Sequence, residues 1–164
     1  MKRILITGAA GLVGGVLREQ LRSDYRLVLL DRADIADLVA GETGVKGDIR
    51  DPAVLAMAMA GVDAVVHLAG EPTEKSWDAI RDANIDGCYQ VVEAARQAGV
   101  RRFVFASSNH AIGYYPRSET IDDKCMPRPD TRYGVSKVFG ETLLRLYADK
   151  FGLTSVCLRI GTLL

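Results

Sequence analysis

The stretch RILITGAAGLVG, residues Arg3–Gly14, decides the fold of this chain. Its apolar, β-branched segment Arg3–Thr7 predicts a strand, glycines follow at positions 8, 11 and 14, and the pattern over Leu12–Ser23 predicts a helix. Glycines between a strand and a helix permit a tight turn and let backbone N–H groups approach a pyrophosphate at the helix N-terminus. Because the required strand and helix flank the glycines, the stretch predicts a dinucleotide-binding turn in preference to a plain tight turn.

Strand and helix patterns alternate along the rest of the chain, and several strands are almost continuously apolar, as expected when both faces of a sheet are buried. This alternation predicts an α/β fold, a doubly wound parallel sheet of the Rossmann type formed by one domain, residues 1–164. A long stretch without a clear period, Ser108–Arg132, interrupts it. The predicted strands are Arg3–Thr7, Arg26–Leu30, Gly44–Lys46, Ala64–Leu68, Arg102–Ala106 and Ser155–Ile160, and the predicted helices are Leu12–Ser23, Pro52–Ala60, Trp77–Ala98 and Tyr133–Phe151, with a weaker helical turn at Ile35–Ala40.

The charge balance, the cysteines and the apolar stretches of the sequence argue against several classes of protein. The 21 basic residues balance the 21 acidic residues without a basic stripe, which argues against nucleic acid or an anionic membrane as the main partner. The dispersed cysteines Cys88, Cys125 and Cys157 indicate free thiols and not a disulfide framework or a zinc site. No apolar stretch approaches the ~20 residues that cross a bilayer, so we expect a cytoplasmic protein without a metal.

Acidic residues after the early strands suggest how a nucleotide is held. Asp31 ends the second strand, where a carboxylate accepts hydrogen bonds from the ribose of NAD and repels a 2′-phosphate; Arg32 beside it leaves some opening for NADP. Asp48 follows the third strand and either accepts from the adenine amine or caps a helix. His67, at the end of the fourth strand, fits a core histidine better than a catalyst.

A phenol and an ammonium lie one helical turn apart in YGVSK, residues Tyr133–Lys137. Tyrosine titrates near pH ~10, and a lysine beside it favours the phenolate. The pair suits removal of a proton from a hydroxyl while a hydride leaves the attached carbon, although an isolated pair of this kind also occurs on helix surfaces. Ser108 lies near the carboxyl edge of the fifth strand, where open α/β sheets bind ligands.

With these landmarks in this order, the chain resembles an extended short-chain dehydrogenase/reductase of the NAD-dependent epimerase/dehydratase family. The resemblance implies that Ser108 hydrogen-bonds the reacting oxygen, that Tyr133 is the proton acceptor, and that Lys137 holds the nicotinamide ribose and lowers the pKa of Tyr133. It assigns Asn84 to a proton relay, although Asn84 could instead bond its own helix backbone. The implied NAD contacts are Gly8, Ala10, Gly11, Leu12, Val13, Gly14, Asp31, Asp48, Ile49, Leu68, Ala69, Gly70 and Lys137.

A narrower resemblance lies in FASSNHAIGYYP, residues Phe105–Pro116, which is similar to the corresponding segment of bacterial uronate dehydrogenases. Those enzymes oxidise C1 of galacturonate or glucuronate with NAD and form the aldarolactone. Pro72 falls where they carry a sugar-contacting serine, so either Thr73 compensates or the substrate differs. For His110 a loop-ordering hydrogen bond is the alternative to sugar contact. The implied substrate contacts are Thr73, Ser108, Asn109, His110, Tyr133 and Thr162.

Members of this family continue beyond the position of Leu164 and supply an arginine for the substrate carboxylate. We therefore expect the C-terminal substrate region to be missing or truncated. The chain is then either a fragment of a longer protein or a shortened protein with a half-open site. The alternatives to a uronate dehydrogenase are a nucleotide-sugar epimerase or dehydratase and a non-catalytic NAD-binding sensor. The resemblance also implies a homo-oligomer, formed through helices such as Trp77–Ala98 and Tyr133–Phe151.

Overall fold

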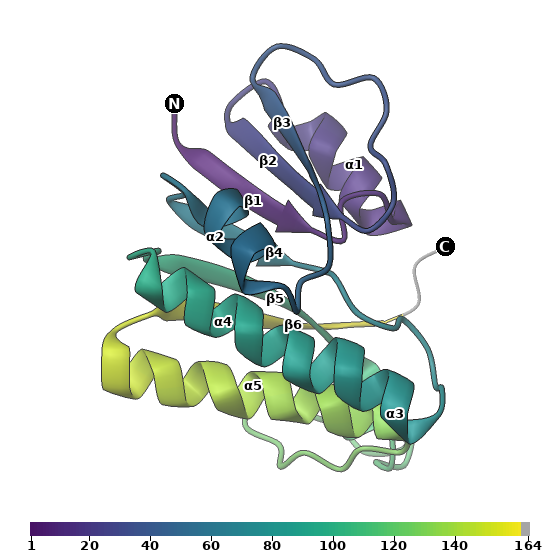
Figure 1. Ribbon diagram of the computed structural model, residues 1–164. Helices are drawn as coiled ribbons and strands as arrows, with labels where there is room; N and C mark the ends of the chain where they lie inside the picture. The colour runs from purple at the N-terminus through teal and green to yellow at the C-terminus, as the bar shows by residue number, and fades with distance from the viewer. Residues whose placement is uncertain (162–164) are drawn as a thin grey trace.

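The computed structural model describes residues 1–161, and within them six parallel strands form one sheet in the order β3-β2-β1-β4-β5-β6 (Figure 1). The strand order reverses beside β1, which pairs with β2 on one side and β4 on the other. Ligands of open α/β sheets bind at the carboxyl ends of the strands at such a reversal. The strands are β1 Arg3–Thr7, β2 Arg26–Asp31, β3 Glu42–Lys46, β4 Ala64–His67, β5 Arg102–Ser108 and β6 Thr154–Ile160, and the helices are α1 Leu12–Leu21, α2 Pro52–Met59, α3 Trp77–Ile80, the π segment η1 Arg81–Asp86, α4 Gly87–Gln97, the 3-10 turn η2 Asn109–Ile112 and α5 Arg132–Phe151.

Helices cover both faces of the sheet, as predicted for a doubly wound fold. Successive residues of a strand point to opposite faces. Ile4 and Ile6 of β1 therefore belong to the core beneath α1, whereas Leu5 belongs to the larger core beneath α2, α4 and α5. Figure 1 shows α4 and α5 side by side over this second face, and contacts between the two helices agree with that view.

Three predicted helix termini, one start and two ends, are confirmed by their capping residues. The carboxylate of Asp51 accepts a hydrogen bond from the Ala53 N–H at the start of α2, where Pro52 occupies the first turn. Gly61 and Gly99, each just past a helix, have φ angles of 68° and 72°. These left-handed conformations favour glycine and end the helices.

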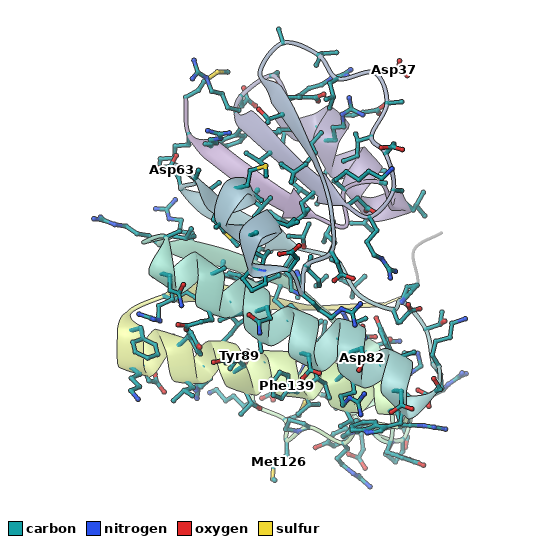
Figure 2. All side chains as sticks on the ribbon, viewed as in Figure 1. Asp37, Asp63, Asp82, Tyr89, Met126 and Phe139 are labelled. Atoms are coloured by element: carbon teal, nitrogen blue, oxygen red, sulfur yellow. The ribbon has the colours of Figure 1, made fainter. Side chains whose placement is uncertain are left out.

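The predicted helical turn at Ile35–Ala40 is wrong: this segment contains no helix. The Arg18 side chain of α1 donates to the backbone oxygens of Ala36 and Asp37, and it pairs with the Glu42 carboxylate at 2.6 Å. These tertiary contacts take backbone oxygens that a helix would use. Asp37, labelled in Figure 2 on this connection, has a φ of 52°.

The predicted single helix over Trp77–Ala98 is three consecutive segments, α3, η1 and α4. The π segment, which carries Asp82 in Figure 2, changes the direction of side chains by widening one turn. It contains Asn84, whose side chain is buried. Segments of this kind occur frequently at functional sites.

The irregular stretch after β5 begins with η2 and then contains no further helix or strand until Arg132. The Tyr115 hydroxyl donates to the Met126 backbone oxygen, and the Tyr114 N–H donates to that of Arg128. Met126 itself is 76% exposed and projects from the loop in Figure 2. The loop is therefore held by its own hydrogen bonds near its base.

Neither a membrane span nor a metal cluster occurs among residues 1–161. No helix there is long and apolar enough to cross a bilayer. No group of three or more His, Cys, Asp or Glu side chains is placed to hold a metal ion. The three cysteines are unpaired.

Candidate active site

A cleft of about 820 Å³ lies at the carboxyl ends of the strands. This volume falls within the range of ~300–1,000 Å³ typical of ligand sites. Ala10 and Thr73 do not line it, Asn84 lies buried outside it, and Thr162 falls outside the described residues. The predicted site residues that line the cleft are Gly8, Gly11, Leu12, Val13, Gly14, Asp31, Asp48, Ile49, Leu68, Ala69, Gly70, Ser108, Asn109, His110, Tyr133 and Lys137.

The glycine turn forms a cradle that side chains would fill. Gly8 has a φ of 73°, and a Cβ atom there would lie 2.8 Å from the Ala69 backbone nitrogen. A Cβ atom at Gly14 would lie 2.5 Å from the Gly8 backbone oxygen. Helix α1 begins at Leu12, and no side chain caps it. Its first-turn N–H groups are thus available to an anion, and the turn fits the pyrophosphate of a dinucleotide.

Asp31 fastens this turn to the end of β2. Its carboxylate accepts from the Ala10 N–H and from the Ala33 N–H, each at 3.0 Å. A carboxylate offers about four lone-pair sites, so acceptor capacity for ribose hydroxyls remains. Ala10 therefore contributes to the site through Asp31 without lining the cleft.

Asp48 is not a helix cap, because Asp51 caps α2. The Asp48 carboxylate instead binds the Arg50 guanidinium at 2.8 Å, and this hydrogen bond lowers the pKa of Asp48 despite the opposing effect of burial. Arg50 also lines the cleft and contacts Asp82 at 3.6 Å. We did not predict Arg50, although its place two residues after Asp48, just before the cap of α2, was the available signal.

The catalytic candidates converge at the other end of the cleft. Lys137 is buried, donates to the Ala106 backbone oxygen at 2.9 Å, and has its Nζ 5.2 Å from the centre of the Tyr133 ring. Burial lowers the pKa of Lys137 to about 8. Burial also raises the pKa of Tyr133, and the hydrogen bond with Ser108 offsets only part of this rise.

The expected lowering of the Tyr133 pKa by Lys137 is therefore not observed in the protein alone. Desolvation disfavours the charged form of each group, so it raises the pKa of Tyr133 and lowers that of Lys137. The pair nevertheless lies on one face of α5, as its spacing predicted.

Asn84 does not bond its own helix backbone. Its Oδ1 accepts from the Glu71 N–H at 2.6 Å, and its Nδ2 donates to the Glu71 backbone oxygen and to the Ser136 hydroxyl, each at 3.1 Å. The Ser136 hydroxyl in turn donates to the Tyr133 backbone oxygen at 2.6 Å. Asn84 thus links the β4–α3 connection to α5, the helix that carries Tyr133, and its part in a proton relay stays a prediction.

His110 lines the cleft and also orders its own loop, because its Nδ1 lies 2.8 Å from the Asp130 carboxylate. Its ring meets the Tyr133 ring edge-on, with centroids 5.8 Å apart. Asn109 accepts from the Ser108 hydroxyl at 3.1 Å. On the β4–α3 connection Pro72 lines the cleft and Thr73 does not, and a sugar contact of Thr73 stays a prediction.

At the end of β5, a cluster of three polar side chains, Ser107, Glu141 and Arg159, was not predicted from the sequence. The Ser107 hydroxyl donates to Glu141 at 2.5 Å, and Arg159 of β6 binds both oxygens of the same carboxylate. Burial alone would raise the pKa of Glu141, but the bonds from Arg159 and Ser107 lower it overall. The signal was the spacing of Glu141, one turn after Lys137 on α5.

His67 lies in the core, as its surroundings predicted. Its Nδ1 is 2.7 Å from the Thr7 hydroxyl, and its ring stacks on Phe105. Burial, with a smaller effect of the Lys137 charge, lowers the pKa of His67 to about 3. It therefore stays neutral in the folded protein under ordinary conditions.

His67 is expected to make the free energy of unfolding depend on pH. Its folded pKa of about 3 lies below the ordinary value of 6.5, so the unfolded chain alone binds a proton between these values. Stability is fully present above pH 6.5 and falls by up to about 1.4 kcal/mol per pH unit as pH decreases through this window. Urea unfolding from pH 7 to about 4.5 measures the slope.

The sequence contains two histidines, which provides a matched control. His67→Gln is expected to flatten the slope even if it lowers overall stability, and the same measurement on His110→Gln shows how much of the slope the other histidine carries. Equal slopes in the two variants would show that His67 does not remain neutral in the folded state.

Known proteins are similar to this chain along nearly all of its length. It is 44% identical over 162 residues to the uronate dehydrogenase of Pseudomonas syringae pv. tomato, covering 98% of this chain and 59% of that protein. It is 44% identical over 177 residues to an L-arabinose 1-dehydrogenase (NAD(P)(+)) of Haloferax volcanii, covering 100% of this chain and 68% of that protein. A crystal structure of a uronate dehydrogenase mutant from Agrobacterium tumefaciens, complexed with NAD, matches with a TM-score of 0.95 and 45% identity over 99% of this chain and 62% of that chain.

The chain spans 59–62% of the length of the curated uronate dehydrogenases that it matches. The family model of the NAD dependent epimerase/dehydratase family matches residues 4–164. Together with the parallel sheet and the glycine turn, this match confirms the resemblance drawn from the sequence. The chain belongs to the NAD dependent epimerase/dehydratase family.

Proposed function

We propose that this chain is the NAD-binding, catalytic part of a dehydrogenase that oxidises a hexuronic acid, galacturonate or glucuronate, at C1 to the aldarolactone. The observation that carries the proposal is one cleft that joins the glycine cradle to Ser108, Tyr133 and Lys137. The similarity to uronate dehydrogenases, one of them solved with NAD, supports the choice of cofactor and substrate. In this proposal residues 1–164 act as a single domain.

The cofactor is held by groups that the structure brings to the cleft. The backbone around Gly8 and the N-terminus of α1 receive the pyrophosphate, and Asp31 accepts from a ribose hydroxyl. Lys137, which lines the cleft, donates to the ribose that carries the nicotinamide. When bound, NAD accepts a hydride and thereby supplies the oxidising power.

Proton transfer falls to Tyr133. The Ser108 hydroxyl orients the C1 oxygen of the sugar, and the phenolate of Tyr133 takes the proton from the C1 hydroxyl. The C1 hydrogen leaves with its electron pair, and the C1–O bond becomes the carbonyl of the lactone. In this proposal the positive charge on Lys137, 5.2 Å from the centre of the Tyr133 ring, opposes the desolvation that raises the pKa of Tyr133 and so favours the phenolate when NAD and the sugar are bound.

The first test is NADH formation by the purified chain with NAD and galacturonate, glucuronate or their neutral parent sugars. NAD binding is measured separately by calorimetry. Turnover with the acids and not with the neutral sugars is the expected result. Epimerisation of a nucleotide sugar without net NADH would favour the epimerase alternative, and NAD binding without turnover of any sugar would favour a binding protein. Self-association and a cytoplasmic location stay predictions.

A further inference from the structure

Asp130 links His110, which lines the cleft, to the start of the helix that carries Tyr133. It lies on the loop just before α5, and its carboxylate Oδ1 is 2.8 Å from His110 Nδ1 and 3.3 Å from the Thr131 hydroxyl, which donates to it. Thr131 is the N-cap of α5, and its hydroxyl oxygen accepts from the Gly134 N–H at 2.9 Å. One carboxylate thus contacts both His110 and the cap of the helix that begins with Tyr133.

Glycines at two backbone positions leave the space that the contact between Asp130 and His110 needs. A Cβ atom at Gly113 would collide with the Asp130 carboxylate, and one at Gly134 would collide with the His110 backbone oxygen. The Asp130 N–H also donates to the His110 backbone oxygen at 3.4 Å. Asp130 and His110 are therefore joined through both side chain and backbone.

We propose that Asp130 is a positioning residue that fixes the tautomer and the ring orientation of His110 for sugar binding. An ionised carboxylate only accepts hydrogen bonds, so His110 Nδ1 must carry the hydrogen. In the neutral ring Nε2 then has a free lone pair and acts as the acceptor for a hydroxyl group of the ligand. This role rests on the proposed function, because it assumes that the ligand beside Tyr133 is a polyhydroxyl compound.

The tautomer can be measured without any turnover. Long-range proton–nitrogen NMR spectra of the 15N-labelled chain distinguish a protonated ring nitrogen from an unprotonated one. The spectra are recorded near pH 8.5, about two units above the ordinary histidine value of ~6.5. With two histidines in the sequence, His110→Gln assigns the signals.

The wild-type ring of His110 is expected to carry its hydrogen on Nδ1. In Asp130→Ala the population is expected to move toward the Nε2–H form, which neutral imidazole favours in water. Asp123→Ala, an exposed aspartate of the same loop, should leave the spectrum unchanged. If Asp130→Ala fails to fold, Asp130→Leu, which is similar in size and cannot accept a hydrogen bond, gives the same comparison.

An Nε2–H tautomer in the wild type, or an unchanged tautomer in Asp130→Ala, would overturn the proposal. In the turnover assay Asp130→Ala is expected to raise KM for the uronate roughly three- to tenfold, the effect of one neutral hydrogen bond, with NAD affinity unchanged. An unaltered KM alongside the shifted tautomer would also overturn the sugar-binding role. Absence of wild-type turnover counts against the proposed function alone, since the NMR result is independent of it.

Discussion

Replacing Gly14 with alanine is expected to destabilise the fold by about 3 kcal/mol and to weaken NAD binding more than a hundredfold. The new Cβ would lie 2.5 Å from the Gly8 oxygen and 2.7 Å from the Ala9 Cα. Both obstacles are backbone atoms, so no side-chain rotation relieves them, and the glycine turn must move away from α1. Because the turn is the proposed pyrophosphate cradle, displacing its N–H groups should weaken NAD binding even in molecules that remain folded. Urea unfolding and calorimetric titration with NAD measure the two effects.

The neighbouring glycine supplies the control. Gly15 lies in the same helix, and a Cβ atom there meets nothing within 4 Å. Gly15→Ala should therefore leave NAD affinity unchanged and stabilise the helix by up to about 1 kcal/mol. If both alanines behaved alike, close packing at Gly14 would not be what shapes the cradle.

Tyr133→Phe is expected to reduce the rate of uronate oxidation by about 10²- to 10⁴-fold, the usual contribution of a general base. The ring is kept, so its edge-on contact with His110 should persist. NAD affinity should change little, because the hydroxyl acts on the C1 proton in this mechanism. Steady-state kinetics and NAD titration on the same preparation separate the two effects.

Tyr114→Phe is the matched control, since Tyr114 is 64% exposed on the loop after η2 and is not part of the cleft lining. The Tyr114→Phe variant should oxidise the uronate at the wild-type rate. Full activity in Tyr133→Phe, with an active wild type, would assign the proton to another group. The expected loss in Tyr133→Phe alone would support Tyr133 as the base.

The glycine turn and the strands were predictable because they depend on local patterns. The segment Arg3–Gly14 carries its strand, turn and helix start within a few residues, and the alternation of elements leaves few other topologies. Tyr133 and Lys137 came together because helical spacing alone places them on one face. The position of Ser108 at the carboxyl edge of the sheet was predictable in the same way, because Ser108 ends the apolar pattern of β5.

Features that depend on distant contacts were missed. The segment Ile35–Ala40 has helical propensity, but Arg18 of α1 takes its backbone oxygens. The π segment could not be predicted from the local sequence, because Asn84 within it is held by bonds to Glu71 and Ser136, which are distant along the chain. Likewise the Ser107–Glu141–Arg159 group joins three elements that only the folded sheet brings together.

The hydrogen bonds from Glu71 through Asn84 and Ser136 to the Tyr133 backbone oxygen also bear on motion. Glu71 and Tyr133 line different walls of the cleft, and the bonds between them are partly or fully shielded from water. A hinge that parted these walls would leave polar groups such as the Asn84 amide without partners, at a cost of about 1–3 kcal/mol for each buried group. Binding of a ligand should therefore leave the β4–α3 connection and α5 in the same relative position, so that these two parts of the cleft move as one rigid body.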